Sequence, residues 1–263
     1  MARYEFRTTR LFVETDLAAD ALVPLDRQQT NYLTNVLRMS EGTPVLVFNG
    51  RDGEWLAGLR QQGRKVFALE IGEQQRAQPP APDLHYLFAP LKQARLDYVV
   101  GKAVEMGVGR LRPVITQHTQ VTKLNRNRAE ANIIEAAEQC GVLAVPTIND
   151  PQPLNGLLDY WRQTDPERRI VFCDEGHPGD DAMTALTGLP PGPLAVLVGP
   201  EGGFSNAERD RLLGLPFVSP LPLGPRILRA DTAAVAALAL VQATVGDWSQ
   251  RQDQSPSATT VAR

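Results

Sequence analysis

Residues 194–206 read LAVLVGPEGGFSN and residues 221–239 read LPLGPRILRADTAAVAALA, and these two stretches are the strongest indication of the fold class. The first stretch opens with an apolar run, residues 194–198, whose length and composition predict a buried parallel strand. Its glycines then predict a sharp turn, and Ser205 with Glu208 has the spacing of a capping box that starts a helix. The second stretch repeats this order of strand, glycine turn and helix. Two such units predict an α/β domain.

The two turns predict a small-molecule site. Ligands of open α/β sheets bind at the carboxyl ends of the strands, and glycines let backbone groups come close to a ligand. The chain has neither a G-x-x-x-x-G-K-[ST] phosphate loop nor the G-x-G-x-x-G dinucleotide pattern, and Glu201 would repel an anion. The ligand is therefore expected to be neutral or cationic, with turns of purely structural purpose as the alternative.

Hydrophobic patterning divides the chain into two domains. Up to residue 73, short β-like runs and one helix at about residues 26–37 predict a small barrel, with Asn49-Gly50 in a turn. A Pro/Gln/Ala-rich linker is expected over residues 74–82. Over residues 83–249 strands alternate with helices, which predicts a parallel sheet. The polar tail, residues 250–263, is expected to be disordered. The predicted strands are 84–89, 110–115, 169–173, 194–198 and 217–221, and the predicted helices are 95–106, 126–140, 207–213 and 231–248.

The composition is that of an ordinary globular protein, with 43% hydrophobic and 22% charged residues and a net charge of −3. No apolar run has the roughly 20 residues of a membrane span, and the amino terminus lacks a signal-peptide core. The two cysteines and three scattered histidines have no metal-ligand spacing, so we expect no metal and a cytoplasmic location. Residues 92–130 carry eight Lys or Arg against three acids, which predicts either a phosphate-binding face or solvated helices.

The chain resembles the ribosomal RNA small subunit methyltransferase E family of the SPOUT superfamily. The two glycine-turn stretches carry most of the resemblance, as LVGPEGGFSNAE and LGPRILRADTAA. Four further segments are similar in the same order: residues 10–13 (RLFV), 32–39 (YLTNVLRM), 101–108 (GKAVEMGV) and 135–140 (EAAEQC).

This resemblance implies a PUA-like RNA-binding barrel followed by a SPOUT domain with a carboxy-terminal trefoil knot. It implies S-adenosylmethionine as cofactor, bound among the turns at residues 173–176, 199–203 and 223–228, and a homodimer whose subunits complete each other's sites. The cofactor-binding residues it implies are Leu197, Gly199, Glu201, Gly202, Leu223, Gly224, Ile227 and Leu228.

The activity that the resemblance implies is methylation of N3 of a uridine in 16S rRNA of the small ribosomal subunit. Arg229 is the first candidate to orient the uracil or to stabilise negative charge on its oxygens. Asp231 is a candidate to hold Arg229 or to act as the base, and the alternative is a structural ion pair between the two. The expected RNA contacts are Arg10, Arg38, Lys92, Lys102, Arg126 and Arg226.

Two departures from the family pattern affect residue roles. Asp231 stands where the family usually has Glu, and Val142 lies where it usually has an arginine. Two other functions stay open for this sequence. One is a different SPOUT activity, methylation of a ribose 2′-hydroxyl. The other is a non-catalytic RNA-binding or assembly protein that keeps the fold.

Overall fold

The amino-terminal domain is built on one mixed five-stranded sheet. The structure, a computed structural model, describes residues 8–64, 66–176 and 181–248. The sheet has the order β1-β3-β4-β5-β2, with β1 parallel to β3 and the other pairs antiparallel. Its elements are β1 (Arg10–Phe12), β2 (Leu22–Pro24), α1 (Arg27–Asn31), the π-helix η1 (Tyr32–Val36), β3 (Pro44–Phe48), β4 (Glu54–Gly63) and β5 (Val66–Arg76).

Inward-facing aliphatic side chains of this sheet form a core of their own, which includes Val45, Val47, Leu59 and Leu69. The turn between β3 and β4 is held by Asn49, whose Oδ1 accepts hydrogen bonds from the backbone of the next residues. This confirms the turn predicted there. The strand β5 is longer than expected: it continues over residues 74–76, which were predicted to belong to the linker. Arg76 at its end forms an ion pair with the buried Glu54.

The carboxy-terminal domain has a seven-stranded sheet of order β12-β10-β11-β6-β7-β8, with β9 also paired to β7, and all its pairs are parallel. The strands are β6 (Leu84–Phe88), β7 (Arg110–Ile115), β8 (Thr147–Ile148), β9 (Gln152–Pro153), β10 (Arg169–Cys173), β11 (Leu194–Val198) and β12 (Val218–Leu221). The helices are α2 (Gln93–Glu105), α3 (Arg126–Cys140), α4 (Leu154–Thr164), α5 (Ala182–Thr187), α6 (Asn206–Leu213) and α7 (Ala230–Thr244).

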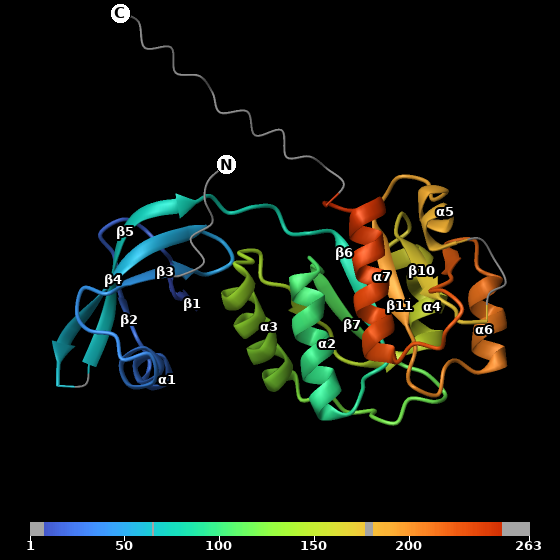
Figure 1. Cartoon of the computed structure of the whole chain (residues 1–263), viewed down its shortest axis with the longest axis horizontal. Coiled ribbons are helices and arrows are strands. Elements are labelled where there is room, and N and C mark those ends of the chain that lie inside the picture. Colours follow the sequence, from blue (N-terminus) through green and yellow to red (C-terminus); the bar gives the residue numbers. More distant parts are fainter. Residues whose placement is uncertain (1–7, 65, 177–180, 249–263) are drawn as a thin grey trace, which may run out of the picture.

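Helices cover both faces of this sheet (Figure 1). Successive residues of a strand point to opposite faces, and in β11 Val196 packs in one core cluster while Ala195 and Leu197 pack in the other. The first cluster contains side chains of α2, α3, α5 and α7, and the second contains side chains of α4 and α6. Burial on both faces explains why the strands read as continuous apolar runs rather than alternating ones.

The long predicted elements of this domain are confirmed, with shifts of a few residues at their ends. The sequence reading missed α4 and α5. The carboxy-terminal helix ends at Thr244 rather than near residue 248, where the backbone of Val245 leaves the helical region. The predicted disordered tail, residues 250–263, lies outside the described residues. The knot stays a prediction.

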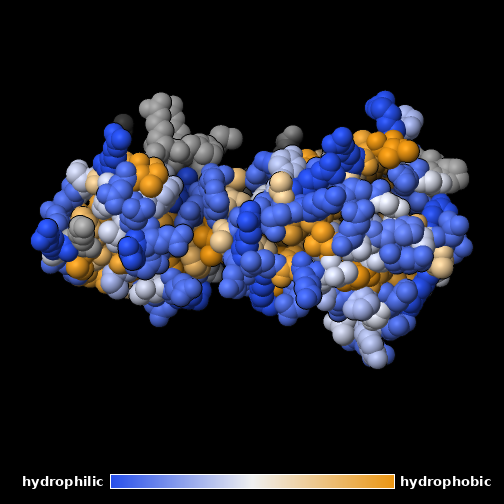
Figure 2. All heavy atoms as spheres, turned by 90° about the horizontal axis from the view of Figure 1, so that it is seen from below, coloured by the Kyte–Doolittle hydropathy of each residue, from blue (hydrophilic) through white to orange (hydrophobic). Residues whose placement is uncertain are grey.

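The two domains lie side by side, and β1 faces α3 (Figure 1). The backbone N–H of Phe12 donates to Glu138 Oε1 at 2.8 Å, and Arg76 Nη2 donates to the Gly141 carbonyl oxygen at 3.1 Å. Hydrophilic side chains cover most of the face shown in Figure 2, with smaller hydrophobic groups between them. None of the helices in the described ranges has the length and apolar character needed to cross a membrane.

Candidate active site

A cavity of about 520 Å³ lies where β10, β11 and β12 end. These three strands are neighbours and parallel, so their carboxyl ends meet at one edge of the sheet. The cavity is lined by the loop after β10, the glycine turn after β11, and the loop between β12 and α7. The glycine pattern predicted two of these turns and the family resemblance implied the third, at residues 173–176, and the structure brings all three together around one space.

The turn after β11 is closely packed. A Cβ atom added to Gly199 would lie 2.6 Å from the ring of Phe204, so no larger residue fits without moving that ring. Ser205 and Glu208 form the predicted capping box at the start of α6. The other carboxylate oxygen of Glu208 accepts from the backbone N–H of Gln117 at 2.8 Å. The turn is therefore fastened both to its own helix and to the loop that follows β7.

The loop before α7 is open to solvent. Gly224 has φ +89°, a left-handed conformation that favours glycine. Ile227 is 85% exposed, which is unusual for a large aliphatic side chain. Arg226 and Arg229 are also exposed and line the cavity, and Arg229 occupies the N-cap position of α7. No carboxylate of the described residues lies within ion-pair distance of either arginine.

The carboxylates around the cavity have other partners. Asp174, which is buried, accepts two hydrogen bonds at 3.0 Å from Arg209 Nε on α6. Glu201 Oε1 accepts from Arg95 Nη1 at 3.1 Å, and Asp231 Oδ2 lies 3.9 Å from Arg95 Nε. The proposed ion pair between Arg229 and Asp231 is therefore absent, because Asp231 faces Arg95 instead.

Cys173 ends β10 and lines the same cavity. Burial raises the pKa of its thiol to about 12, since an apolar environment disfavours the charged thiolate. The thiol is thus protonated at neutral pH and is a poor nucleophile.

Most of the predicted cofactor residues line this cavity. Leu197 does not, because its side chain is fully buried in the core cluster beneath α4 and α6. Asp231 lies beside the cavity rather than on its wall. Sequence reasoning missed Arg95 and Arg209, whose partners are distant in the chain. The predicted residues that line the cavity are Gly199, Glu201, Gly202, Leu223, Gly224, Arg226, Ile227, Leu228 and Arg229.

The predicted RNA contacts differ in their surroundings. Arg38 and Lys92 are exposed. Lys102 forms an ion pair with Glu105 and Arg126 forms one with Glu130, each within its own helix. The prediction for Arg10 was wrong: its side chain is buried and pairs with Glu54 at 2.9 Å, which leaves almost no surface for a phosphate.

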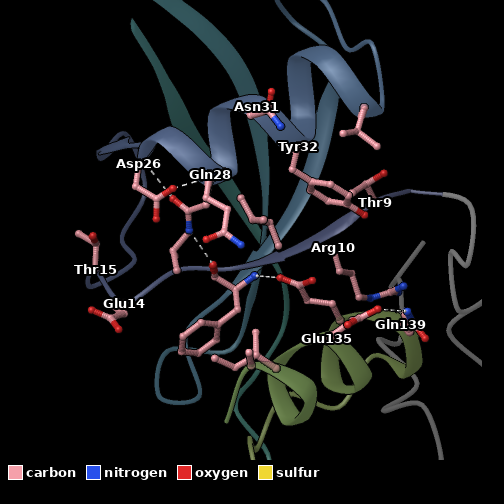
Figure 3. Close-up of a pocket in the computed structure, with 18 of the residues that line it drawn as sticks. Thr9, Arg10, Glu14, Thr15, Asp26, Gln28, Asn31, Tyr32, Glu135 and Gln139 are labelled. Carbon is pink, nitrogen blue, oxygen red and sulfur yellow. Dashed lines mark hydrogen bonds between the residues drawn. The ribbon is translucent and has the colours of Figure 1, made fainter. Parts of the chain in front are cut away.

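A second cavity, of about 910 Å³, lies between the two domains (Figure 3). Its walls are α1 and η1 on one side and α3 on the other, with β1 between them. Glu14, Asp26, Glu135 and Glu138 are among its lining residues. Burial raises the pKa of Glu138, the residue that accepts from the Phe12 backbone. The cleft is part of the contact between the domains, since both contribute lining residues, and its carboxylates would repel RNA phosphates.

Residues 78–242 match the family model described as an RNA methyltransferase domain, and residues 25–67 match the RNA methyltransferase PUA domain. The chain belongs to the RNA methyltransferase family. The first match contains the whole cavity with its three loops, and the second lies in the amino-terminal sheet domain, so the family match covers both domains of the fold.

Relatives of this RNA methyltransferase match along most of its length. The ribosomal RNA small subunit methyltransferase E of Rickettsia conorii is 28% identical over 235 residues, covering 89% of this chain and 94% of the relative. A putative methyltransferase of Legionella pneumophila, solved with the bound cofactor SAM, is 29% identical with a TM-score of 0.78 and covers 90% of this chain and 98% of its own. A ribosomal RNA small subunit methyltransferase E of Neisseria gonorrhoeae bound to S-adenosyl methionine shares the fold, with 24% identity, a TM-score of 0.81 and coverages of 92% and 100%.

Proposed function

We propose that this RNA methyltransferase transfers a methyl group from S-adenosylmethionine to N3 of a uridine in the 16S rRNA of the small ribosomal subunit. The observation that carries the proposal is the glycine-lined cavity, which has on its wall an exposed arginine, Arg229, without an ion-pair partner among the described residues. The name of the relative from Rickettsia conorii supports the substrate, and the SAM-bound neighbour from Legionella pneumophila supports the cofactor.

The cavity suits S-adenosylmethionine in size and in chemistry. Its volume of about 520 Å³ lies within the range of small-molecule sites. The loops at residues 199–203 and 223–228 offer backbone groups, and Glu175 places a carboxylate on the wall for a ligand that carries positive charge. When bound, the cofactor supplies an electrophilic methyl group on a sulfonium.

The residues beside the cavity then have to present the base. N3 lies on the Watson–Crick edge of uracil, so the uridine must be unpaired or flipped out. We assign to Arg229 the binding of the uracil oxygens, where negative charge develops as N3 loses its proton. Such a preorganised cation stabilises a transition state by electrostatic attraction. We assign acceptance of the N3 proton to Asp231, which follows Arg229 by two residues at the start of α7.

The wider setting is part of the same proposal. We expect the chain to form a homodimer in the cytoplasm, with its carboxy-terminal segment threaded through a trefoil knot, as the family resemblance implies. The exposed cations Arg38, Lys92 and Arg226 are the residues that we assign to RNA phosphates.

The experiment is mass spectrometry of small-subunit rRNA from cells with and without the gene. The proposal predicts loss of one 3-methyluridine, restored by the wild-type gene but not by an Arg229→Ala gene. A loss of a 2′-O-methyl nucleoside instead would move the activity to the ribose. An unchanged set of modified nucleosides would favour a non-catalytic RNA-binding protein and overturn the proposal.

A further inference from the structure

Four arginines gather around the cavity, and they divide into two pairs. Arg209 binds Asp174, and Arg95 faces Glu201 and Asp231. Arg226 and Arg229 have no ion pair with any residue in the described part of the chain. Two of these four arginines therefore have carboxylate partners, and the charge of the other two is available to a ligand.

Arg95 occupies an unusual place among these residues. It belongs to the first turn of α2, yet it reaches both glycine-turn segments: Nη1 lies 3.1 Å from Glu201 Oε1 and Nε lies 3.9 Å from Asp231 Oδ2. A guanidinium presents its N–H donors in a rigid fork, so one side chain can face two carboxylates from fixed directions. Arg95 thus links α2, the turn after β11 and the start of α7.

These contacts contribute little to stability. The Arg95 side chain is 38% exposed, and exposed ion pairs stabilise a fold by about 0–1 kcal/mol. These ion pairs act instead on the electrostatic surroundings of Arg229. Without Arg95, two carboxylates without a partner would lie beside the loop that carries Arg229, and charges of opposite sign attract at close range. Arg229 would then be drawn to them and away from a ligand.

We propose that Arg95 is a positioning residue for methyl transfer: by binding Glu201 and Asp231, it leaves Arg229 free to bind the RNA base. The inference rests on the proposed function, because it needs a methyl-transfer reaction in which Arg229 takes part. It concerns the turnover step, since Arg95 contacts Glu201 of the cavity wall but does not itself line the cavity.

The first test measures methylation in vitro on small subunits from cells that lack the gene. Arg95→Ala should lower kcat about 10- to 100-fold, the size expected when a reacting group is misplaced by about 1 Å. KM for the subunit and the dissociation constant of S-adenosylmethionine should stay within about threefold of the wild type, a change under 1 kcal/mol. Arg95→Lys should restore part of the lost kcat.

Arg211→Ala is the matched control. Arg211 on α6 has a similarly exposed side chain (33%) and binds Asp159 and Asn155, away from the cavity. The Arg211→Ala variant should methylate the subunit with the wild-type kcat. If Arg95→Ala raised KM and left kcat unchanged, Arg95 would be a phosphate contact and the inference would be wrong. An inactive wild type would instead refute the proposed function itself.

A second-site variant tests the electrostatic cause. Adding Glu201→Gln to Arg95→Ala neutralises one of the two carboxylates that have lost Arg95 as a partner. The kcat should then recover by at least about threefold, or about 0.7 kcal/mol. Adding Asp210→Asn instead neutralises an exposed carboxylate of α6 that lies outside the cavity wall and that Arg95 does not contact, and kcat should stay as low as in the single variant. Equal rates for both double variants would overturn the inference.

Discussion

The two edges of the carboxy-terminal sheet use arginine in opposite ways. At the carboxyl edge, Arg226 and Arg229 are exposed beside glycine turns and lack ion pairs with the described residues. At the amino edge, the side chain of Arg168 is only 6% exposed and is surrounded by acceptors. It donates to Asp165 at 2.7 Å, to the Leu194 carbonyl at 3.0 Å and to the Asp83 carbonyl at 2.9 Å.

The surroundings of Arg168 make the amino edge a rigid one. Trp161 is fully buried and donates its indole N–H to the Arg168 carbonyl at 2.8 Å, and Arg112 stacks over the Trp161 ring at 4.7 Å. His85 lies buried in the same cluster. A buried arginine with several acceptors stabilises the fold, whereas an exposed arginine beside a cavity is available to a substrate. Variants at the two edges should therefore separate activity from stability.

The largest effect is expected at the carboxyl edge. Arg229→Ala should lower kcat for rRNA methylation about 100- to 1000-fold, because removing one preorganised electrostatic group costs that much in other enzymes. The melting temperature and the affinity for S-adenosylmethionine should stay near the wild-type values. Kinetic assays measure the methylation rate, and calorimetry measures the melting temperature and the affinity for S-adenosylmethionine. If this variant failed to fold, Arg229 would be needed for stability, and the proposed difference between the two edges would be wrong.

A change at the amino edge should act on stability instead. Arg168→Ala should lower the free energy of unfolding by about 2–3 kcal/mol, because it leaves buried carbonyl groups and Asp165 without their charged donor. Denaturant unfolding measures this loss, and Arg60→Ala, which breaks the exposed ion pair with Glu70, should cost well under 1 kcal/mol. At a temperature where both variants remain folded, kcat should be unchanged. A fall in kcat without a fall in stability would contradict the comparison.

A smaller effect should appear on acidification. Burial, together with the nearby charges of Arg168 and Arg112, lowers the pKa of His85 from 6.5 to about 4. Below pH 6.5 the unfolded chain binds a proton at this site that the folded chain does not bind. The stability contributed by neutral His85 is therefore complete above pH 6.5 and is lost as the pH falls towards 4, by about 2 kcal/mol at pH 4.5.

The control for this effect is His85→Gln, which cannot titrate. Carboxylates also change charge in this range, so the informative quantity is the difference between the two unfolding curves from pH 7 to 4.5. The wild type should lose more stability than the variant. Parallel curves would show that His85 becomes protonated without cost and that this edge is less rigid than the structure indicates.

Much of the site was predictable because it depends on local sequence. The apolar run of β11, the glycine turn after it and the capping box of Ser205 and Glu208 are each contained in a few neighbouring residues. The placement of Arg229 beside the second turn follows from the same short stretch. α4 could have been predicted, because its buried residues Leu154, Leu157, Leu158 and Trp161 have the i, i+3, i+4, i+7 spacing of an amphipathic helix. Pro153 and Gly156 at its start weaken that signal.

Local sequence patterns were enough to predict the parallel sheet, the two glycine turns and the edge at which they meet. Which arginines are available to a substrate depends on how the chain folds. Arg10 looked like an RNA contact but is buried against Glu54, and Arg95 reaches Glu201 across 106 positions of the chain. The physical reason is that burial and ion pairing join residues that are far apart in sequence, whereas strand, turn and cap signals lie between neighbours.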